Sequence, residues 1–198
     1  MAAMSPQRAA EFASGRSYAR AAIFAHQQRG RHGQHDYSQH GDGELPIAVP
    51  IAASRAPVWP RGLVGSLTHS DTWYAAAVAA DRDQVALGID LETIAVQDPG
   101  IWDIVLHPTE ARSRPWVRFS AKESLFKLYN PLMHRWLDFT EAVVELTEDY
   151  SDGAFASGKL RFRLLVPGPA ALSDVTGVWV QGSALVATAA WLDRSAWI

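Results

Sequence analysis

The pattern of apolar residues changes its period at Asn130-Pro131, and this change limits the possible folds more than any other feature of the sequence. Up to that point the segment 119–130 has the spacing of a helix, which we expect to end there because proline lacks a backbone N–H. Beyond it, apolar and polar residues alternate, as in strands that bury one face. This pattern predicts strands at 139–145, 159–166, 175–180 and 184–190, the last two forming a hairpin. An antiparallel sheet with helices on one side belongs to the α+β class.

The first half of the chain shows a similar succession of a helix and paired strands. Ser5-Pro6 is a typical N-cap and first turn, and the Ala-rich stretch after it is predicted to be helical to about residue 28, with any break expected near Ser14-Gly15. A strand at 47–51, a hairpin over 64–80 and a strand at 85–91 follow. The turn at 81–83 is the predicted boundary between an N-terminal half, 1–83, and a C-terminal half, 84–198.

Residues 29–46 are rich in glycine and histidine and have no hydrophobic period, which indicates a surface loop. Four of their side chains could form a metal site, namely His32, His35, Asp36 and His40. Their spacing matches no zinc-binding pattern, so we favour the loop.

The segment 119–127, FSAKESLFK, gathers an acid and two bases within one helical turn. Ser120 and Glu123 have the spacing of a capping box, which predicts that a helix begins here. Glu123 and Lys127 lie four residues apart and therefore share a face, whereas Lys122 lies about 100° around the helix. Taken alone, this pattern fits a capped helix with a solvated ion pair.

The segment 88–92, GIDLE, follows an apolar run and predicts a strand. Residues two apart on a strand point to the same face, so Asp90 and Glu92 place two carboxylates side by side. Such carboxylates repel unless a cation lies between them, and Mg²⁺, which prefers oxygen ligands, would resolve that repulsion. Taken alone, the segment fits a strand end with a charged outer face.

The segment 65–70, GSLTHS, alternates as a strand that ends at His69. Asp71-Thr72-Trp73 then turns the chain into a second strand, 74–80. A single histidine at a strand end usually has no chemical role, so this motif carries little weight by itself.

The order and spacing of these motifs, PVWP at 57–60, then GSLTHS, GIDLE and FSAKESLFK, resembles the 4'-phosphopantetheinyl transferases. Within that family the chain is similar to the surfactin and enterobactin-synthase type rather than to the short, trimeric acyl-carrier-protein synthases. The resemblance runs from about Gly15 to the C-terminus. It implies a pseudo-dimer of two similar α+β halves, each an antiparallel sheet packed with helices, with the active cleft between them.

The resemblance also implies roles for individual residues. Mg²⁺ would be held by three acids, Asp90, Glu92 and Glu123. Coenzyme A would be bound by Arg16, Arg20, Arg55, Ser66, His69, Lys122 and Lys127. The catalytic residues would be Glu123, as the base, together with Lys127 and His69. For Arg20 a solvated helix face is an equal alternative, and for Arg55 a plain loop arginine.

Composition limits the partners and the compartment. A net charge of −3 without a basic, aromatic stripe argues against nucleic acid, and no apolar run is long enough for a membrane helix or a signal peptide. The absence of cysteine excludes a thiolate metal site and fits a cytoplasmic protein. Between His107 and Arg135, six bases face two acids, which suggests a docking surface for an acidic carrier protein. We expect a monomer, because the cleft of a pseudo-dimer lies within one chain.

The resemblance implies Mg²⁺-dependent transfer of 4'-phosphopantetheine from coenzyme A to a serine of an apo acyl- or peptidyl-carrier protein. The alternative is a relative that binds coenzyme A or a carrier without turnover. A different Mg²⁺-dependent nucleotide enzyme would need a glycine-rich phosphate loop, and neither GxxxxGK[ST] nor GxGxxG occurs. Whether the carrier serves siderophore, polyketide, non-ribosomal peptide or fatty acid synthesis is left open by the sequence.

Overall fold

The computed structural model describes the backbone of residues 6–31, 48–52 and 56–197, and the side chains of 13–29, 48–52 and 56–197. The helices are α1 (Pro6–Arg31), α2 (Ile101–Val105) and α3 (Pro115–Met133). The strands are β1 (Leu63–Ser70), β2 (Trp73–Ala80), β3 (Gln84–Thr93), β4 (Ala142–Ser151), β5 (Ala156–Leu164), β6 (Thr176–Gln181) and β7 (Leu185–Asp193). Short 3-10 helices η1 (Phe139–Glu141), η2 (Ala170–Asp174) and η3 (Arg194–Ala196) complete the described elements.

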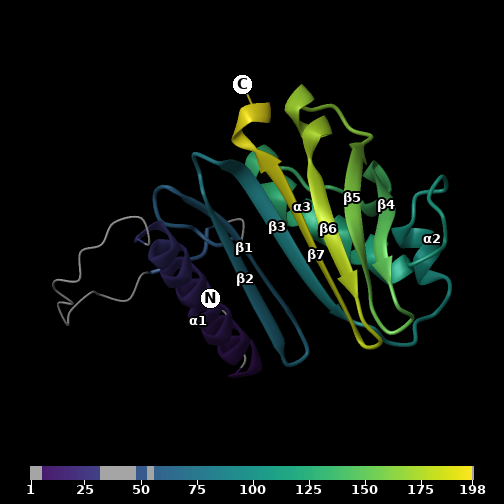
Figure 1. Ribbon diagram of the computed structural model, residues 1–198, viewed down its shortest axis with the longest axis horizontal. Helices are drawn as coiled ribbons and strands as arrows, with labels where there is room; N and C mark the ends of the chain where they lie inside the picture. The colour runs from purple at the N-terminus through teal and green to yellow at the C-terminus, as the bar shows by residue number, and fades with distance from the viewer. Residues whose placement is uncertain (1–5, 32–47, 53–55, 198) are drawn as a thin grey trace.

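Two antiparallel sheets with helices packed on them confirm the α+β class (Figure 1). The first sheet consists of β1 and β2 and is covered by α1. The second has five strands in the order β3-β7-β6-β5-β4, and α3 packs mainly on β3 and β7. The two parts therefore differ in strand number, although each combines a sheet with one long helix.

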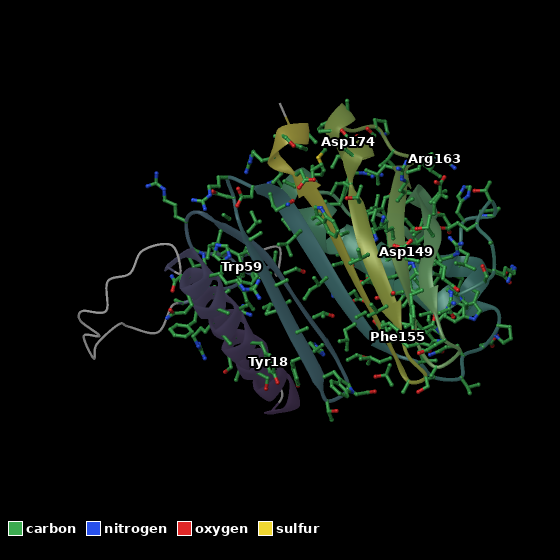
Figure 2. All side chains as sticks on the ribbon, viewed as in Figure 1. Tyr18, Trp59, Asp149, Phe155, Arg163 and Asp174 are labelled. Carbon is green, nitrogen blue, oxygen red and sulfur yellow. The ribbon has the colours of Figure 1, made fainter. Side chains whose placement is uncertain are left out.

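The apolar core divides in the same way. A large cluster lies between α3 and the five-stranded sheet, where Leu125, Leu128 and Trp179 are buried. A smaller cluster beneath α1 joins Ala19 and Ile23 to Val49, with Trp59 packed against it. Figure 2 shows Trp59 and the α1 residue Tyr18 on the side of the molecule away from Arg163 and Asp174. Each sheet thus has its own helix and its own apolar interface.

The two sheets meet along β1 and β3 through side-chain hydroxyl groups. The hydrogen bonds join Ser66 to Ile89, Thr68 to Asp90, and Ser70 to Thr93. Successive bonds advance along both strands, so β1 and β3 run in the same direction. No backbone ladder joins these two strands in the described part of the chain, since they belong to separate sheets. We call this set of contacts the hydroxyl seam.

The predicted limits of α3 are wrong at both ends. The helix begins at Pro115, after Arg114 in the left-handed conformation, so Ser120 lies in its interior instead of at its N-cap. The Ser120 hydroxyl is buried and lies 3.0 Å from that of Thr188 on β7. Pro131 lies inside the last turn, where a proline removes only one helical hydrogen bond. His134, with a φ of 50°, ends the helix.

The other predicted helices and strands are present, with one exception, although β4 begins three residues after its predicted start and ends six residues beyond its predicted end. The predicted strand at 47–51 is reduced, in the described residues 48–51, to a single bridge between Ile51 and Pro57. The helix α1 continues through Ser14-Gly15 without a break. The Gly- and His-rich residues 32–46 lie outside the described residues, as does Arg55.

Candidate active site

Strand β3 and helix α3 bring the predicted acids and Lys127 together. Asp90 is 4% exposed and lies on the side of β3 that faces α3, because its Oδ1 accepts a hydrogen bond of 2.7 Å from Lys127 Nζ. Glu92 is two residues further along and therefore lies on the same side of the strand. Glu123 lies one helical turn before Lys127. The two motifs GIDLE and FSAKESLFK thus form one site.

Lys127 connects the two sheets as well as the two motifs. Its ammonium group donates to Asp90 on β3, to the backbone oxygen of Ile89 at 3.2 Å, and to the Thr68 hydroxyl on β1 at 3.0 Å. The Thr68 hydroxyl in turn lies 3.2 Å from Asp90 Oδ1. A base, an acid and a hydroxyl from three separate elements therefore share one small hydrogen-bonded group.

Burial and neighbouring negative charge raise the pKa of Glu92 and of Glu123. For Glu92, burial is the largest cause, followed by the negative charge of Asp90, and the pKa rises to about 7 although Lys127 opposes the shift. The pKa of Glu123 is also raised, first by burial and then by Asp90. Negative charge is therefore concentrated here beyond what Lys127 neutralises. A site with excess negative charge favours a cation.

The donor set fits a hard divalent cation. The second carboxylate oxygen of Asp90, Oδ2, is buried and has no hydrogen-bond partner among the described residues. Such an oxygen is costly to bury unless a donor or a metal contacts it. The described ranges nevertheless contain no group of three or more acids or histidines already arranged as a metal site. The carboxylates would have to close around an ion.

Thr68 is a site residue that the sequence analysis missed, and the signal that could have found it is the alternation of β1. Ser66, Thr68 and Ser70 are spaced two apart, so their hydroxyls lie on one face of the strand. Ser66 itself is buried and binds the Ile89 N–H through its hydroxyl at 3.1 Å. The predicted site residue Ser66 thus lies in the hydroxyl seam.

His69 lies on the opposite face of β1 from Thr68, because neighbouring residues of a strand point to opposite sides. Its ring is exposed and packs at 5.6 Å from that of Tyr74, which in turn stacks on Tyr18 of α1. The structure therefore does not bring His69 to the carboxylates. It brings His69 to the side of the first sheet that carries α1.

The predicted coenzyme-binding arginines Arg16 and Arg20 belong to α1, the helix that also carries Tyr18. Arg16 is half-buried, and burial lowers the pKa of its guanidinium. Arg20 is exposed and donates to Ser17 on its own helix at 3.3 Å. Among the described residues, Arg20 makes no hydrogen bond or ion pair with Asp90, Glu92 or Glu123. Arg55 lies outside the described residues.

The prediction that Lys122 contacts coenzyme A is not supported by its surroundings. Its ammonium is buried and donates to the backbone oxygens of Val105 and Phe139 and to Glu110, at 2.6 to 2.8 Å. An ammonium has three hydrogens, so these acceptors use all of them. Lys122 points into the protein and leaves none of its donors for a phosphate.

The basic segment 107–135 is less positive in space than along the sequence. Acids from elsewhere pair with its arginines, as in the contacts of Arg112 with Asp103, Arg114 with Glu148 and Arg135 with Glu141. These pairs offset much of the local positive charge on which the proposed docking surface depended. None of the described helices is long and apolar enough to cross a lipid bilayer.

Two family models match this chain. The model of the 4'-phosphopantetheinyl transferase N-terminal domain matches residues 1–79. The model of the 4'-phosphopantetheinyl transferase superfamily matches residues 86–163, which include both acidic motifs.

Individual proteins similar to this chain are also 4'-phosphopantetheinyl transferases. The chain is 40% identical to the 4'-phosphopantetheinyl transferase Svp of Streptomyces mobaraensis over 201 residues, covering 93% of this chain and 72% of that protein. It is 38% identical to the transferase Npt of Nocardia iowensis over 166 residues, covering 74% of this chain and 72% of the relative. It is 37% identical to the transferase PptT of Mycobacterium tuberculosis over 160 residues, covering 74% and 70%.

Proposed function

The chain belongs to the 4'-phosphopantetheinyl transferase superfamily, and we propose that it transfers 4'-phosphopantetheine from coenzyme A to a serine of an apo carrier protein. The products are the holo-carrier protein and adenosine 3',5'-bisphosphate, so the enzyme is of the holo-[acyl-carrier-protein] synthase type. The observation that carries this proposal is the cluster of Asp90, Glu92 and Glu123 around Lys127, where the two motifs and both sheets meet.

In the proposed reaction the serine oxygen forms a bond to the β-phosphorus of coenzyme A, and the bond from that phosphorus to the bridging oxygen breaks. Glu123 accepts the serine proton, since a carboxylate with a raised pKa is a better base near neutral pH. The ammonium of Lys127 offsets the negative charge that the leaving bisphosphate gains. Such reactions depend mainly on positioning and on charge neutralisation.

Three acids of this chain, Asp90, Glu92 and Glu123, would hold Mg²⁺, which when bound neutralises charge on the diphosphate. The unpartnered Oδ2 of Asp90 supports this assignment. Thr68 holds the other oxygen of Asp90 in place. We propose that coenzyme A is held by Arg16, Arg20, Arg55, Ser66, His69 and Lys127. Lys122 is left out of this set because its donors are occupied.

A panel of apo acyl- and peptidyl-carrier proteins, incubated with the enzyme, coenzyme A and Mg²⁺, tests the proposal. Intact-mass spectrometry should show one carrier gaining a phosphopantetheine group, and a chelator should abolish the gain. A matched reaction with a carrier whose modified serine is replaced by alanine should give no product.

The alternative is a relative that binds coenzyme A without transferring it. Calorimetry that detects coenzyme binding while every carrier in the panel keeps its mass would favour this alternative. The retention of acids and a base in contact across two motifs argues for turnover.

A further inference from the structure

Three charged side chains are buried on or next to α3, the helix that carries the proposed base. The exposed side-chain fractions are 0% for Glu110, 2% for Lys122 and 7% for Arg118. Lys122 and Arg118 belong to α3, whereas Glu110 lies in the turn after α2. This buried ion-pair network has no role in the proposed chemistry, because the donors and acceptors it uses face the protein interior.

The network joins segments that are far apart in the sequence. Lys122 Nζ donates to Glu110 Oε2 at 2.6 Å, to the Val105 oxygen at 2.8 Å and to the Phe139 oxygen at 2.7 Å. Glu110 also accepts from the backbone N–H groups of His107, at 2.7 Å, and Val144, at 2.6 Å. One lysine and one glutamate thus connect α3 to the end of α2, to the following turn and to the start of β4.

Stability alone does not account for such a network. Burial of two ions costs about as much as their attraction returns, so an apolar pair of similar volume generally stabilises a fold as well. Apolar contacts have no preferred direction, whereas hydrogen bonds do. An ammonium bound to three fixed acceptors therefore fixes both the rotation of its helix about the helix axis and its position along that axis. The opposite side of α3 is fixed by the Ser124 hydroxyl, 2.6 Å from that of Thr188.

Lys122 directly precedes Glu123, so the two side chains leave α3 about 100° apart. The direction of Lys122 therefore sets the direction in which Glu123, and Lys127 one turn later, face β3. We propose that Glu110 and Lys122 are positioning residues that aim Glu123 and Lys127 at Asp90. This inference rests on the proposed transferase function. A misplacement of about 1 Å in such a site lowers turnover by roughly 10²-fold.

The test compares the wild type with the double variant Lys122→Met/Glu110→Gln, which removes both charges together. Removal of one charge alone would leave the other buried and unpaired, which is strongly destabilising. The double variant leaves Arg118 without the Glu110 carboxylate, but the Arg118 guanidinium keeps its hydrogen bonds to the backbone oxygens of Ser113 and Val144. The matched control is Lys159→Met/Asp149→Asn, which removes an exposed ion pair between β5 and β4. Asp149 is labelled in Figure 2. Three quantities are measured: the melting temperature, kcat and KM for coenzyme A, and the rise in melting temperature on adding Mg²⁺ without substrates.

We expect the double variant to fold with a melting temperature close to that of the wild type. Its kcat should fall about 10- to 100-fold while its KM for coenzyme A changes less than threefold, and the Mg²⁺-induced rise should shrink. The control variant should match the wild type in all three quantities. A folded double variant with wild-type kcat and a wild-type response to Mg²⁺ would overturn the positioning role, as would a double variant that does not fold. A wild type that modifies no carrier would instead contradict the proposed function.

Discussion

Asp90 shows how one buried carboxylate can serve two partners. Its Oδ1 is shared by Thr68 and Lys127, whereas its Oδ2 has no partner among the described residues. The first oxygen is therefore held by the protein itself, and the second is left for a ligand. This division of roles within a single side chain supports the assignment of Asp90 as a metal-binding residue.

The variant Asp90→Asn keeps the shape of the side chain and removes its charge. We expect transfer activity to fall by roughly 10²- to 10³-fold, since one electrostatic contact to the reacting groups is lost. The melting temperature should no longer rise when Mg²⁺ is added, whereas the circular dichroism spectrum should match that of the wild type. A variant with full activity would contradict the metal assignment.

Glu92 makes the stability of the metal-free protein depend on pH. Its pKa rises from an ordinary 4.5 to about 7 on folding, mainly because of burial and the charge of Asp90. Between these values the folded protein holds more protons than the unfolded chain, so the free energy of unfolding falls as the pH rises. Denaturant titrations in chelator at several pH values should show this fall. The decrease in the free energy of unfolding with rising pH should be smaller in Glu92→Gln. In the wild type, Mg²⁺ should also make this decrease smaller.

At the scale of elements, the contact between α3 and β3 decides where Glu123 lies. Gly88 of β3 faces the α3 backbone so closely that a Cβ there would overlap the carbonyl oxygen of Ser124. A helix and a strand can approach this closely only where the strand has no side chain. Gly88, at the start of the GIDLE motif, therefore belongs to the packing that brings the two motifs together.

Replacement of this glycine should separate the two elements. We expect Gly88→Ala to lower the free energy of unfolding by about 1–3 kcal/mol, because the added methyl group must push α3 away. The transfer activity of Gly88→Ala should fall by a larger factor than its fraction of folded protein. Gly15→Ala is the control for stability, because outside the backbone of its own helix no atom of the described residues lies within 4 Å of its added Cβ. It lies inside α1 and should be neutral or stabilising by about 0.4–1 kcal/mol.

Local sequence patterns predicted the elements better than their limits. The alternation of apolar residues located β4 to β7, because every second side chain of a strand lies on the buried face of the sheet. The start of α3 was misplaced because Ser120 has the sequence features of an N-cap, yet bonds to Thr188, which lies 68 residues away. The buried position of Lys122 was not evident from the sequence for the same reason, since its partner Glu110 is 12 residues distant. Contacts of this kind are fixed by the fold and leave no local pattern.

At the scale of the whole molecule, the hydroxyl seam joins the first sheet to the second. Its contacts are single hydrogen bonds of 3.1 to 3.3 Å from Ser66, Thr68 and Ser70 to residues of β3. Lys127 adds a bridge from α3 to Thr68. The acids of GIDLE therefore lie at the line where the two parts of the molecule join.

The double variant Ser66→Ala/Ser70→Ala removes three of the four hydrogen bonds of the seam. We expect a loss of about 0.5–1.5 kcal/mol for each hydrogen bond in the free energy of unfolding. Hydrogen exchange should accelerate at the amides of Ile89 and Thr93, which these two hydroxyls accept from. The amides of β6, which pair only with β5 and β7, are the internal reference and should exchange at an unchanged rate. Unchanged exchange at Ile89 and Thr93 would show that the seam does not depend on the two serines.

Side-chain hydrogen bonds between two strands differ from the backbone hydrogen bonds within a sheet in the partners that can replace them. A serine or threonine hydroxyl can give up one neighbour and take a water molecule or a phosphate oxygen in its place, while the main chain on both sides stays intact. The line between β1 and β3 depends on three side chains, Ser66, Thr68 and Ser70, so loss of these contacts leaves the backbone ladder of each sheet intact.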